Sequence, residues 1–189
     1  MSRKKMIWIP DSFYNISSRG NNREPLFHSP DDFDTFFNIL DHLHENIPFE
    51  LASYCLMTNH YHLQMRCAEV PISKMMFFIN KRYANYFNNK YELKGHVFEK
   101  RYYGGLIRDE EGMLAVSRYI HMNPVEACIV GHPHHYLYSS YKFYVNPDLP
   151  KPPYMNIHSI LDLYTGTTEE KLNKYLNEVP VTTRILSNE

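Results

Sequence analysis

The sequence predicts an α+β domain in which antiparallel strands pack against amphipathic helices. Two β-rich runs, 49–57 and 60–66, are separated only by Thr58 and Asn59, a spacing typical of adjacent antiparallel strands. Apolar residues also recur at helical spacing in the segments before and after these runs. A chain of 189 residues is long enough to bury the core of one such domain.

The N-terminal part predicts a strand followed by a helix. Residues 13–19 alternate in character and end at the turn-forming cluster 20–22. The helix should begin at Ser29-Pro30-Asp31-Asp32, which combines a hydroxyl cap, a proline in the first turn and carboxylates near the positive end of the helix dipole. Its apolar stripe stops before Pro48.

The middle of the chain predicts two further helices and a strand. Pro71 opens a helix whose apolar stripe is more typical of core packing than of a cofactor site. A strand signal lies at 95–107, where Gly104-Gly105 indicates a bulge or a close backbone approach. Asp109 should begin the third helix, which should end before Pro124 because proline disfavours helical geometry at the preceding residue.

The C-terminal part has a different character. The proline-rich segment 147–153 predicts a linker, and 167–177 predicts a short helix. We therefore expect a main domain at 1–144 and an extension, formed by the linker and the helix, at 145–189.

Composition indicates a soluble globular protein, with 43% hydrophobic and 22% charged residues. No apolar run approaches the roughly 20 residues that a membrane span needs, so no membrane partner is expected. The basic N-terminus lacks the apolar segment and the cleavage site of a signal peptide. The three scattered cysteines indicate reduced thiols in a cytoplasmic protein, two of them buried in or beside strands.

Charge is unevenly distributed along the chain. The net charge of −1 by itself argues against a nucleic-acid partner. Between Lys74 and Arg108, however, eight basic residues stand against two acidic ones. Such a local excess fits contact with a phosphate backbone, although a solvated helix face would carry the same charges.

The chain has three H-x-H pairs, namely His42/His44, His60/His62 and His132/His134. On a strand, alternate side chains share a face, so His60 and His62 would project together while Tyr61 points the other way. On a helix, residues two apart point about 200° apart, which disfavours the first pair, and the third flanks a proline in a loop. His60 and His62 are therefore the candidate metal ligands, with burial in the core as the alternative.

A second motif lies on the third helix. Tyr119 and Asn123 are four residues apart and share a helical face, whereas His121 lies on another side and is expected to be exposed. A phenol and a neutral oxygen ligand so placed fit attack on a phosphodiester held by a divalent metal. The alternative is that Tyr119 simply packs, as one of sixteen tyrosines.

Four motifs in order carry a family resemblance: Met57-x-Asn59-His60-x-His62, Gly95-x-Val97-Phe98-Glu99-x-Arg101-Tyr102, Arg118-Tyr119-Ile120-x-x-Asn123-Pro124-Val125-x-Ala127 and Tyr136-x-x-Ser139-Ser140-Tyr141. Together they resemble the single-tyrosine HUH transposases and, within these, the REP-associated tyrosine transposases. The resemblance covers 13–144 and leaves the tail uncovered.

The resemblance implies a central antiparallel β-sheet flanked by α-helices, in ferredoxin-like topology, with the histidines on a central strand. His60, His62 and Asn123 would bind Mg²⁺ or Mn²⁺, and Tyr119 would be the nucleophile. Such enzymes cleave single-stranded DNA next to a repeat hairpin, leaving a 5′-phosphotyrosine and a free 3′-OH. We expect this chain to be a monomer or a homodimer, with the active site completed either within one chain or across the dimer, and to be nucleoid-associated in a bacterial-type cytoplasm.

The chain departs from the family pattern at two places. Thr58 stands where proline is common, a change that should leave His60 in place. Glu126 and Cys128 replace the common basic residue and glycine. The loss of the basic residue removes a possible phosphate contact and bears on DNA affinity more than on chemistry.

Candidate contacts to the DNA backbone are five basic residues: Lys81, Arg82, Arg101, Arg108 and Arg118. Candidate stacking partners for unpaired bases are three aromatic residues: Tyr83, Tyr86 and Phe98. For each cation the alternative is a solvated surface, and for the aromatic residues it is core packing.

Three other readings of the whole chain stay open. The first is a catalytically idle, domesticated protein that binds DNA hairpins. The second is a metal-dependent hydrolase that uses His60 and His62 with water as nucleophile, which would need a further acidic or histidine ligand. The third is a structural module in which both histidines are merely buried.

Overall fold

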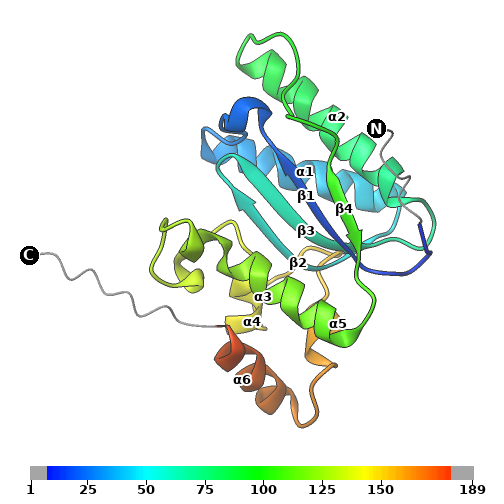
Figure 1. Cartoon of the computed structure of the whole chain (residues 1–189), viewed down its shortest axis with the longest axis vertical. Helices are drawn as coiled ribbons and strands as arrows, with labels where there is room; N and C mark the ends of the chain where they lie inside the picture. The colour runs from blue at the N-terminus through cyan, green and yellow to red at the C-terminus, as the bar shows by residue number, and fades with distance from the viewer. Residues whose placement is uncertain (1–7, 180–189) are drawn as a thin grey trace, which may run out of the picture.

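The computed structural model describes residues 8–179 and contains one four-stranded antiparallel sheet (Figure 1). Its strands are β1 (Tyr14–Arg19), β2 (Glu50–Met57), β3 (His60–Arg66) and β4 (Tyr103–Leu106), in the order β2-β3-β1-β4. With helices after β1 and β3, this order is the ferredoxin-like topology, so the expected α+β fold is confirmed. Residues 1–7, where no signal peptide is predicted, and the end of the predicted extension, 180–189, lie outside the described residues.

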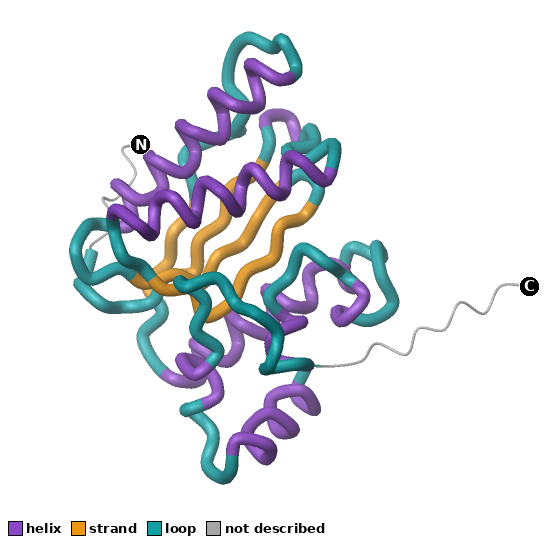
Figure 2. The backbone as a smooth tube through the Cα atoms, turned by 180° about the vertical axis from the view of Figure 1, so that it is seen from behind, coloured by secondary structure: helices purple, strands orange, loops and turns teal. Residues whose placement is uncertain are grey.

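Helices cover both faces of the sheet. The helices α1 (Pro30–Asn46) and α2 (Ile72–Lys90) lie side by side on one face, as Figure 2 shows from behind. The helix α3 (Glu110–Glu126) packs on the other face, against β2 and β3. Tyr61 points to the first face, where its ring lies 4.8 Å from that of Phe36. The histidines on either side of Tyr61 therefore point towards α3.

The buried carboxylate of Asp32 joins the start of α1 to the end of α2. It accepts hydrogen bonds from the backbone N–H groups of His28 (2.7 Å) and Ser29 (2.9 Å). From the end of α2 it accepts bonds from Lys90 Nζ (2.7 Å) and from the hydroxyls of Tyr86 (2.8 Å) and Tyr91 (2.7 Å). Burial alone would raise the pKa of Asp32, but these bonds outweigh burial and hold the pKa well below its usual value.

The expected end of α3 at Asn123 is wrong, because the helix continues through Pro124 to Glu126. Proline removes a single N–H near the end of the helix, where few further bonds depend on it. The following carbonyls still find donors, since Asn123 O accepts from Ala127 N (2.9 Å) and Pro124 O accepts from Ile129 N (2.9 Å). Pro124 is itself buried, so tertiary packing outweighs the local preference.

The glycine pair in β4 does not form a bulge. Gly104 pairs with Ile16 and Gly105 with Asn15 in continuous register. The strand is shorter than the signal at 95–107, and it lies at the edge of the sheet. Gly105 instead allows a close approach, because a Cβ atom there would lie 3.0 Å from the Tyr103 hydroxyl.

The helix α4 (Tyr141–Val145) spans the boundary expected at 144, and buried residues beyond it, including Tyr154, Ile160 and Tyr175, belong to the main core. After α4 come α5 (His158–Leu161) and α6 (Thr168–Glu178), the last close to the helix expected at 167–177. The segment 147–153 contains no helix or strand. Beyond it, Tyr154 O accepts from Leu51 N at 2.7 Å and Asn156 N donates to Leu51 O at 2.9 Å, which ties the chain to β2.

Within residues 8–179, none of the helices combines the length and apolar character needed to cross a bilayer. All three cysteines are free thiols, with Cys55 and Cys67 buried and Cys128 exposed, as the sequence predicts.

Replacing Asp32 by Asn should lower the free energy of unfolding by about 2 kcal/mol or more, because buried donors lose a charged acceptor. Since the folded pKa of Asp32 lies below its unfolded value, its stabilisation is present above that value and is lost as pH falls. The difference between Asp32→Asn and wild type should therefore narrow from about pH 5 to about pH 3. Urea denaturation at several pH values measures it. A difference that stays constant with pH would show that the carboxylate charge does not stabilise the fold.

Candidate active site

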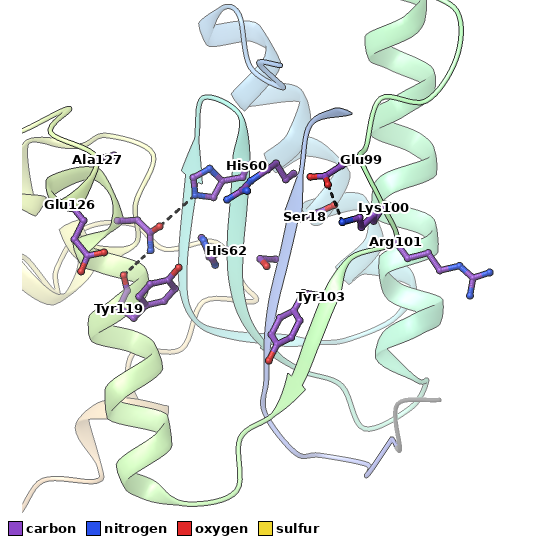
Figure 3. Close-up of a pocket in the computed structure, with 13 residues that line it drawn as sticks. Ser18, His60, His62, Glu99, Lys100, Arg101, Tyr103, Tyr119, Glu126 and Ala127 are labelled. Carbon is purple, nitrogen blue, oxygen red and sulfur yellow. Dashed lines mark hydrogen bonds and ion pairs between the residues drawn. The ribbon is translucent and has the colours of Figure 1, made fainter. Parts of the chain in front are cut away.

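The strand β3 presents His60 and His62 to α3 on one face. The register places His60 opposite Arg19 and His62 opposite Ser17 on β1. The two imidazole centroids lie 5.1 Å apart, nearly perpendicular to each other (Figure 3). His62 is only 7% exposed, whereas His60 is partly exposed at the cavity. The expected pairing of these side chains on one strand face is therefore observed.

Both imidazoles are neutral at pH 7. Burial, with a smaller contribution from His60 and Arg19, lowers the pKa of His62 to about 3. Burial also lowers the pKa of His60. His60 Nδ1 lies 2.7 Å from Asn59 Oδ1. Because an amide oxygen can only accept, Nδ1 carries the proton and donates this bond. The other ring nitrogen, Nε2, therefore has a free lone pair, which faces the cavity. His62 Nδ1 is buried without a hydrogen-bond partner. Neutral imidazoles with free lone pairs are the form that binds metals.

A buried glutamine sets the position of α3 on the sheet. Gln64, two residues beyond His62 on the same face of β3, accepts a hydrogen bond from Ser53 Oγ at 2.7 Å. Its amide nitrogen donates to the carbonyl of Met113 on α3 at 3.0 Å. At the helix start, the Asp109 carboxylate caps the N–H of Gly112 at 2.8 Å. These bonds fix which side chains of α3 face the histidines.

Tyr119 and Asn123 are the side chains of α3 that reach the histidine pair. The ring of Tyr119 lies edge-on to His62 with centroids 5.2 Å apart, and the side chain is 45% exposed. Asn123 Nδ2 donates to the carbonyl of Tyr119 at 2.8 Å, which turns Oδ1 towards His60 Nε2 at 3.5 Å (dashed lines in Figure 3). The structure thus brings the four candidate residues together.

The contact between His60 and Asn123 indicates that a cation fits between these side chains. With its proton on Nδ1, His60 offers a lone pair at Nε2, and Asn123 offers another at Oδ1. Two acceptors facing each other at 3.5 Å repel unless a positive charge lies between or beside them. The described residues contain no cluster of three His, Cys, Asp or Glu placed for a metal. The set here differs because its third donor is an amide oxygen, and imidazole with amide oxygen suits a divalent cation.

The four residues open onto one cavity of about 560 Å³. Three basic side chains also line it, namely Arg19, Lys100 and Arg101, together with the carboxylates of Glu99 and Glu126. Glu99 is paired with Lys100 at 3.1 Å, which lowers the pKa of Glu99. Arg101 points away from the histidines in Figure 3, towards the outer rim.

The other predicted DNA contacts lie outside this cavity. Lys81 and Arg82 are exposed on α2, which covers the opposite face of the sheet, and Arg108 is exposed before α3. Arg118 pairs with Glu178 on α6. Among the predicted stacking residues, Tyr83 is fully buried. Arg19 and Tyr103 also line the cavity but carry no local sequence signal, because their proximity to the histidines follows only from strand register.

His121 is buried rather than exposed, so that expectation is wrong. Its Nδ1 lies 2.5 Å from the Tyr175 hydroxyl and its Nε2 lies 2.7 Å from Ser140 Oγ. The Tyr175 hydroxyl also bonds Ser117 Oγ at 2.7 Å. The helix is enclosed on this side by α6, which the helical pattern of α3 could not reveal. Burial lowers the pKa of His121 to about 3, so it acts as a neutral hydrogen-bonding group.

Comparison with known proteins identifies the class. Residues 11–123 match the family described as Transposase IS200 like, and the chain therefore belongs to that family of transposases. A REP-associated tyrosine transposase, solved bound to a REP hairpin, aligns with a TM-score of 0.67 and 18% identity, covering 89% of this chain and 93% of that chain. The family resemblance is thus confirmed.

A candidate transposase from Deinococcus radiodurans R1 aligns with a TM-score of 0.44 and 13% identity, covering 63% of this chain and 95% of that chain. No protein of curated function matches the sequence.

Replacing Tyr175 by Phe should lower the free energy of unfolding by about 1–3 kcal/mol, because it leaves buried His121 and Ser117 without their shared partner. Chemical denaturation measures the effect. Tyr164→Phe is the matched control, since it removes a hydroxyl that bonds Glu178 at the surface and should cost less than about 0.5 kcal/mol. Equal losses in the two variants would contradict the buried network.

Proposed function

We propose that this chain is a DNA strand transferase that nicks and rejoins single-stranded DNA beside hairpins through a 5′-phosphotyrosine intermediate. The observation that carries this proposal is the meeting of Tyr119 with His62, and of Asn123 with His60, in one open cavity. Membership of the IS200-like transposases supports the reaction class.

The metal-binding residues are His60, His62 and Asn123. His60 Nε2 and Asn123 Oδ1 already face each other, and His62 adds the second imidazole from the same strand face. Asn59 holds the His60 tautomer, and the Tyr119 carbonyl holds the Asn123 amide. When bound, Mg²⁺ or Mn²⁺ supplies positive charge that stabilises the charge developing on the phosphate.

Tyr119 is the nucleophile. Its exposed ring leaves the phenol oxygen accessible from the cavity, unlike the buried tyrosines around it. The phenol oxygen attacks phosphorus and gives up its proton, and the bond from phosphorus to the 3′ oxygen breaks. The 3′ oxygen takes up a proton and leaves as a free 3′-OH, while the 5′ phosphate stays on Tyr119. Attack by another 3′-OH reverses these steps and rejoins the strand without an external energy source.

The basic residues of the cavity and the ligand of the solved relative both favour a nucleic-acid substrate. Arg19, Lys100 and Arg101 line the cavity and can contact phosphates on either side of the reacting one. The solved relative of similar fold was bound to a REP hairpin, which supports a hairpin beside the single-stranded segment here. Hydrolysis by water is not favoured by any observation, since a phenol already stands beside His62.

Tyr119→Phe should abolish covalent adduct formation on single-stranded oligonucleotides with a hairpin, because the variant lacks the attacking oxygen. DNA binding should persist, and removing metal with EDTA should reproduce the loss of cleavage. Denaturing gels of labelled DNA with Mn²⁺ detect the adduct. The matched control is Tyr103→Phe, at the other exposed tyrosine of the cavity, which should still form the adduct. Adduct formation by Tyr119→Phe would refute its assignment as nucleophile.

Mn²⁺ should raise the melting temperature of the wild-type protein, because a ligand that binds only the folded state stabilises it. At about 100 times the dissociation constant the gain is about 2.7 kcal/mol, or roughly 5–10 °C for a chain of this size. His60→Ala and His62→Ala should lose the shift. His134→Ala, at an exposed histidine outside the cavity, should keep it. A shift that survives in both cavity variants would place the metal elsewhere.

A further inference from the structure

The cavity contains a second exposed aromatic side chain that the reaction does not use. Among the exposed large apolar side chains of residues 8–179, Tyr103 and Tyr119 are the two that line the cavity. Tyr103 is 53% exposed, although it lies on a strand of the sheet. Single exposed aromatic residues are common on protein surfaces. An exposed aromatic side chain inside a candidate active site, however, is well placed to contact a ligand.

Strand register places Tyr103 on the same face as the histidines. Ser17 on β1 pairs with His62 on one side and with Tyr103 on the other, so the three residues form a row across the sheet. Two strand spacings separate His62 from Tyr103, roughly 10 Å. Because the side chain of Ser17 is small, the sheet surface between His62 and Tyr103 forms a low floor. Figure 3 shows Tyr103 on β4, across β1 from the histidine pair.

A glycine allows the ring of Tyr103 to lie along its own strand. A Cβ atom at Gly105 would lie 3.0 Å from the Tyr103 hydroxyl and 3.5 Å from two ring carbons. The phenol therefore extends over the bare backbone of Gly105, which supports it from below. About half of the Tyr103 side chain remains exposed, and it lines the cavity.

We propose that Tyr103 is a base-stacking platform for an unpaired nucleotide next to the phosphate at His60 and His62. This inference rests on the proposed function and adds a binding subsite to it. A nucleotide whose phosphate lies at the histidine pair can place its base, or that of its neighbour, over the low floor formed by Ser17 and onto the ring. Lys100 and Arg101, just before Tyr103 in the chain, line the same cavity and are suited to the adjoining phosphates.

Stacking predicts a distinct pattern of specificity. Every base has a π-face, so the platform should bind a base of any identity and depend little on the Tyr103 hydroxyl. It would hold the strand that is to be cut while leaving sequence selection to other contacts. A hydrogen bond from the hydroxyl would predict the opposite, with phenylalanine as poor as leucine.

Measuring DNA binding in a variant that cannot cleave separates the contribution of Tyr103 to affinity from the strand-cleavage reaction. In a Tyr119→Phe background, the probe is a fluorescein-labelled oligothymidylate of about 12 nucleotides, with Kd measured by fluorescence anisotropy. Tyr103→Leu should raise Kd about 5- to 100-fold, the range expected for the loss of one stacked base. Tyr103→Phe should stay within about twofold of the parent, because the ring is retained.

Two controls separate stacking from other effects. An abasic oligomer of the same length and charge should bind the parent and Tyr103→Leu equally, because it has no base to stack. Phe77→Leu changes an exposed aromatic residue on α2, outside the cavity, and should leave Kd for oligothymidylate unchanged. Melting curves of each variant check that the fold is intact.

Several outcomes would overturn the inference. They are an unchanged Kd in Tyr103→Leu, an equal loss on the abasic oligomer, a loss in Tyr103→Phe as large as in Tyr103→Leu, and no binding of oligothymidylate by the parent. Failure of the proposed function is distinguishable from these. If wild type forms no adduct on hairpin substrates but Tyr103→Leu still weakens binding as expected, the stacking site stands and the nucleophile assignment fails.

Discussion

The alternation of side chains along β3 is the constraint on which the site depends, because successive residues of a strand must point to opposite faces. Tyr61 is buried against α1 and α2 and donates to Asn80, which fixes the register of the strand against its neighbours. His60 and His62 are then committed to the other face. A slip of one residue would bury the imidazoles among aromatic rings and expose the tyrosine.

The second requirement is a fixed position for α3, which supplies the phenol and the amide. Gln64 holds the start of this helix from the sheet, and Tyr175 of α6 holds its middle through His121. The C-terminal helix thus bears on the residues next to Tyr119, although it carries no side chain of the cavity. The packing of α6 therefore helps to set where α3 holds Tyr119.

Local patterns predicted most of the elements, since strand alternation, helix caps and turn residues act over a few positions. They failed where a distant part of the chain intervenes. Pro124 stays helical because it is buried and because later N–H groups satisfy the last carbonyls. His121 is buried because α6 covers a face of α3 that local spacing leaves unassigned.

The sequence by itself determined which residues are candidates, and the order of its motifs indicated the family. The alternation in His60-Tyr61-His62 and the four-residue spacing of Tyr119 and Asn123 could be recognised because both are local geometry. Only the tertiary structure decided that these residues meet, because the distance from β3 to α3 depends on packing between segments some sixty residues apart. It also decided that Tyr103 joins them, since strand register is a long-range property.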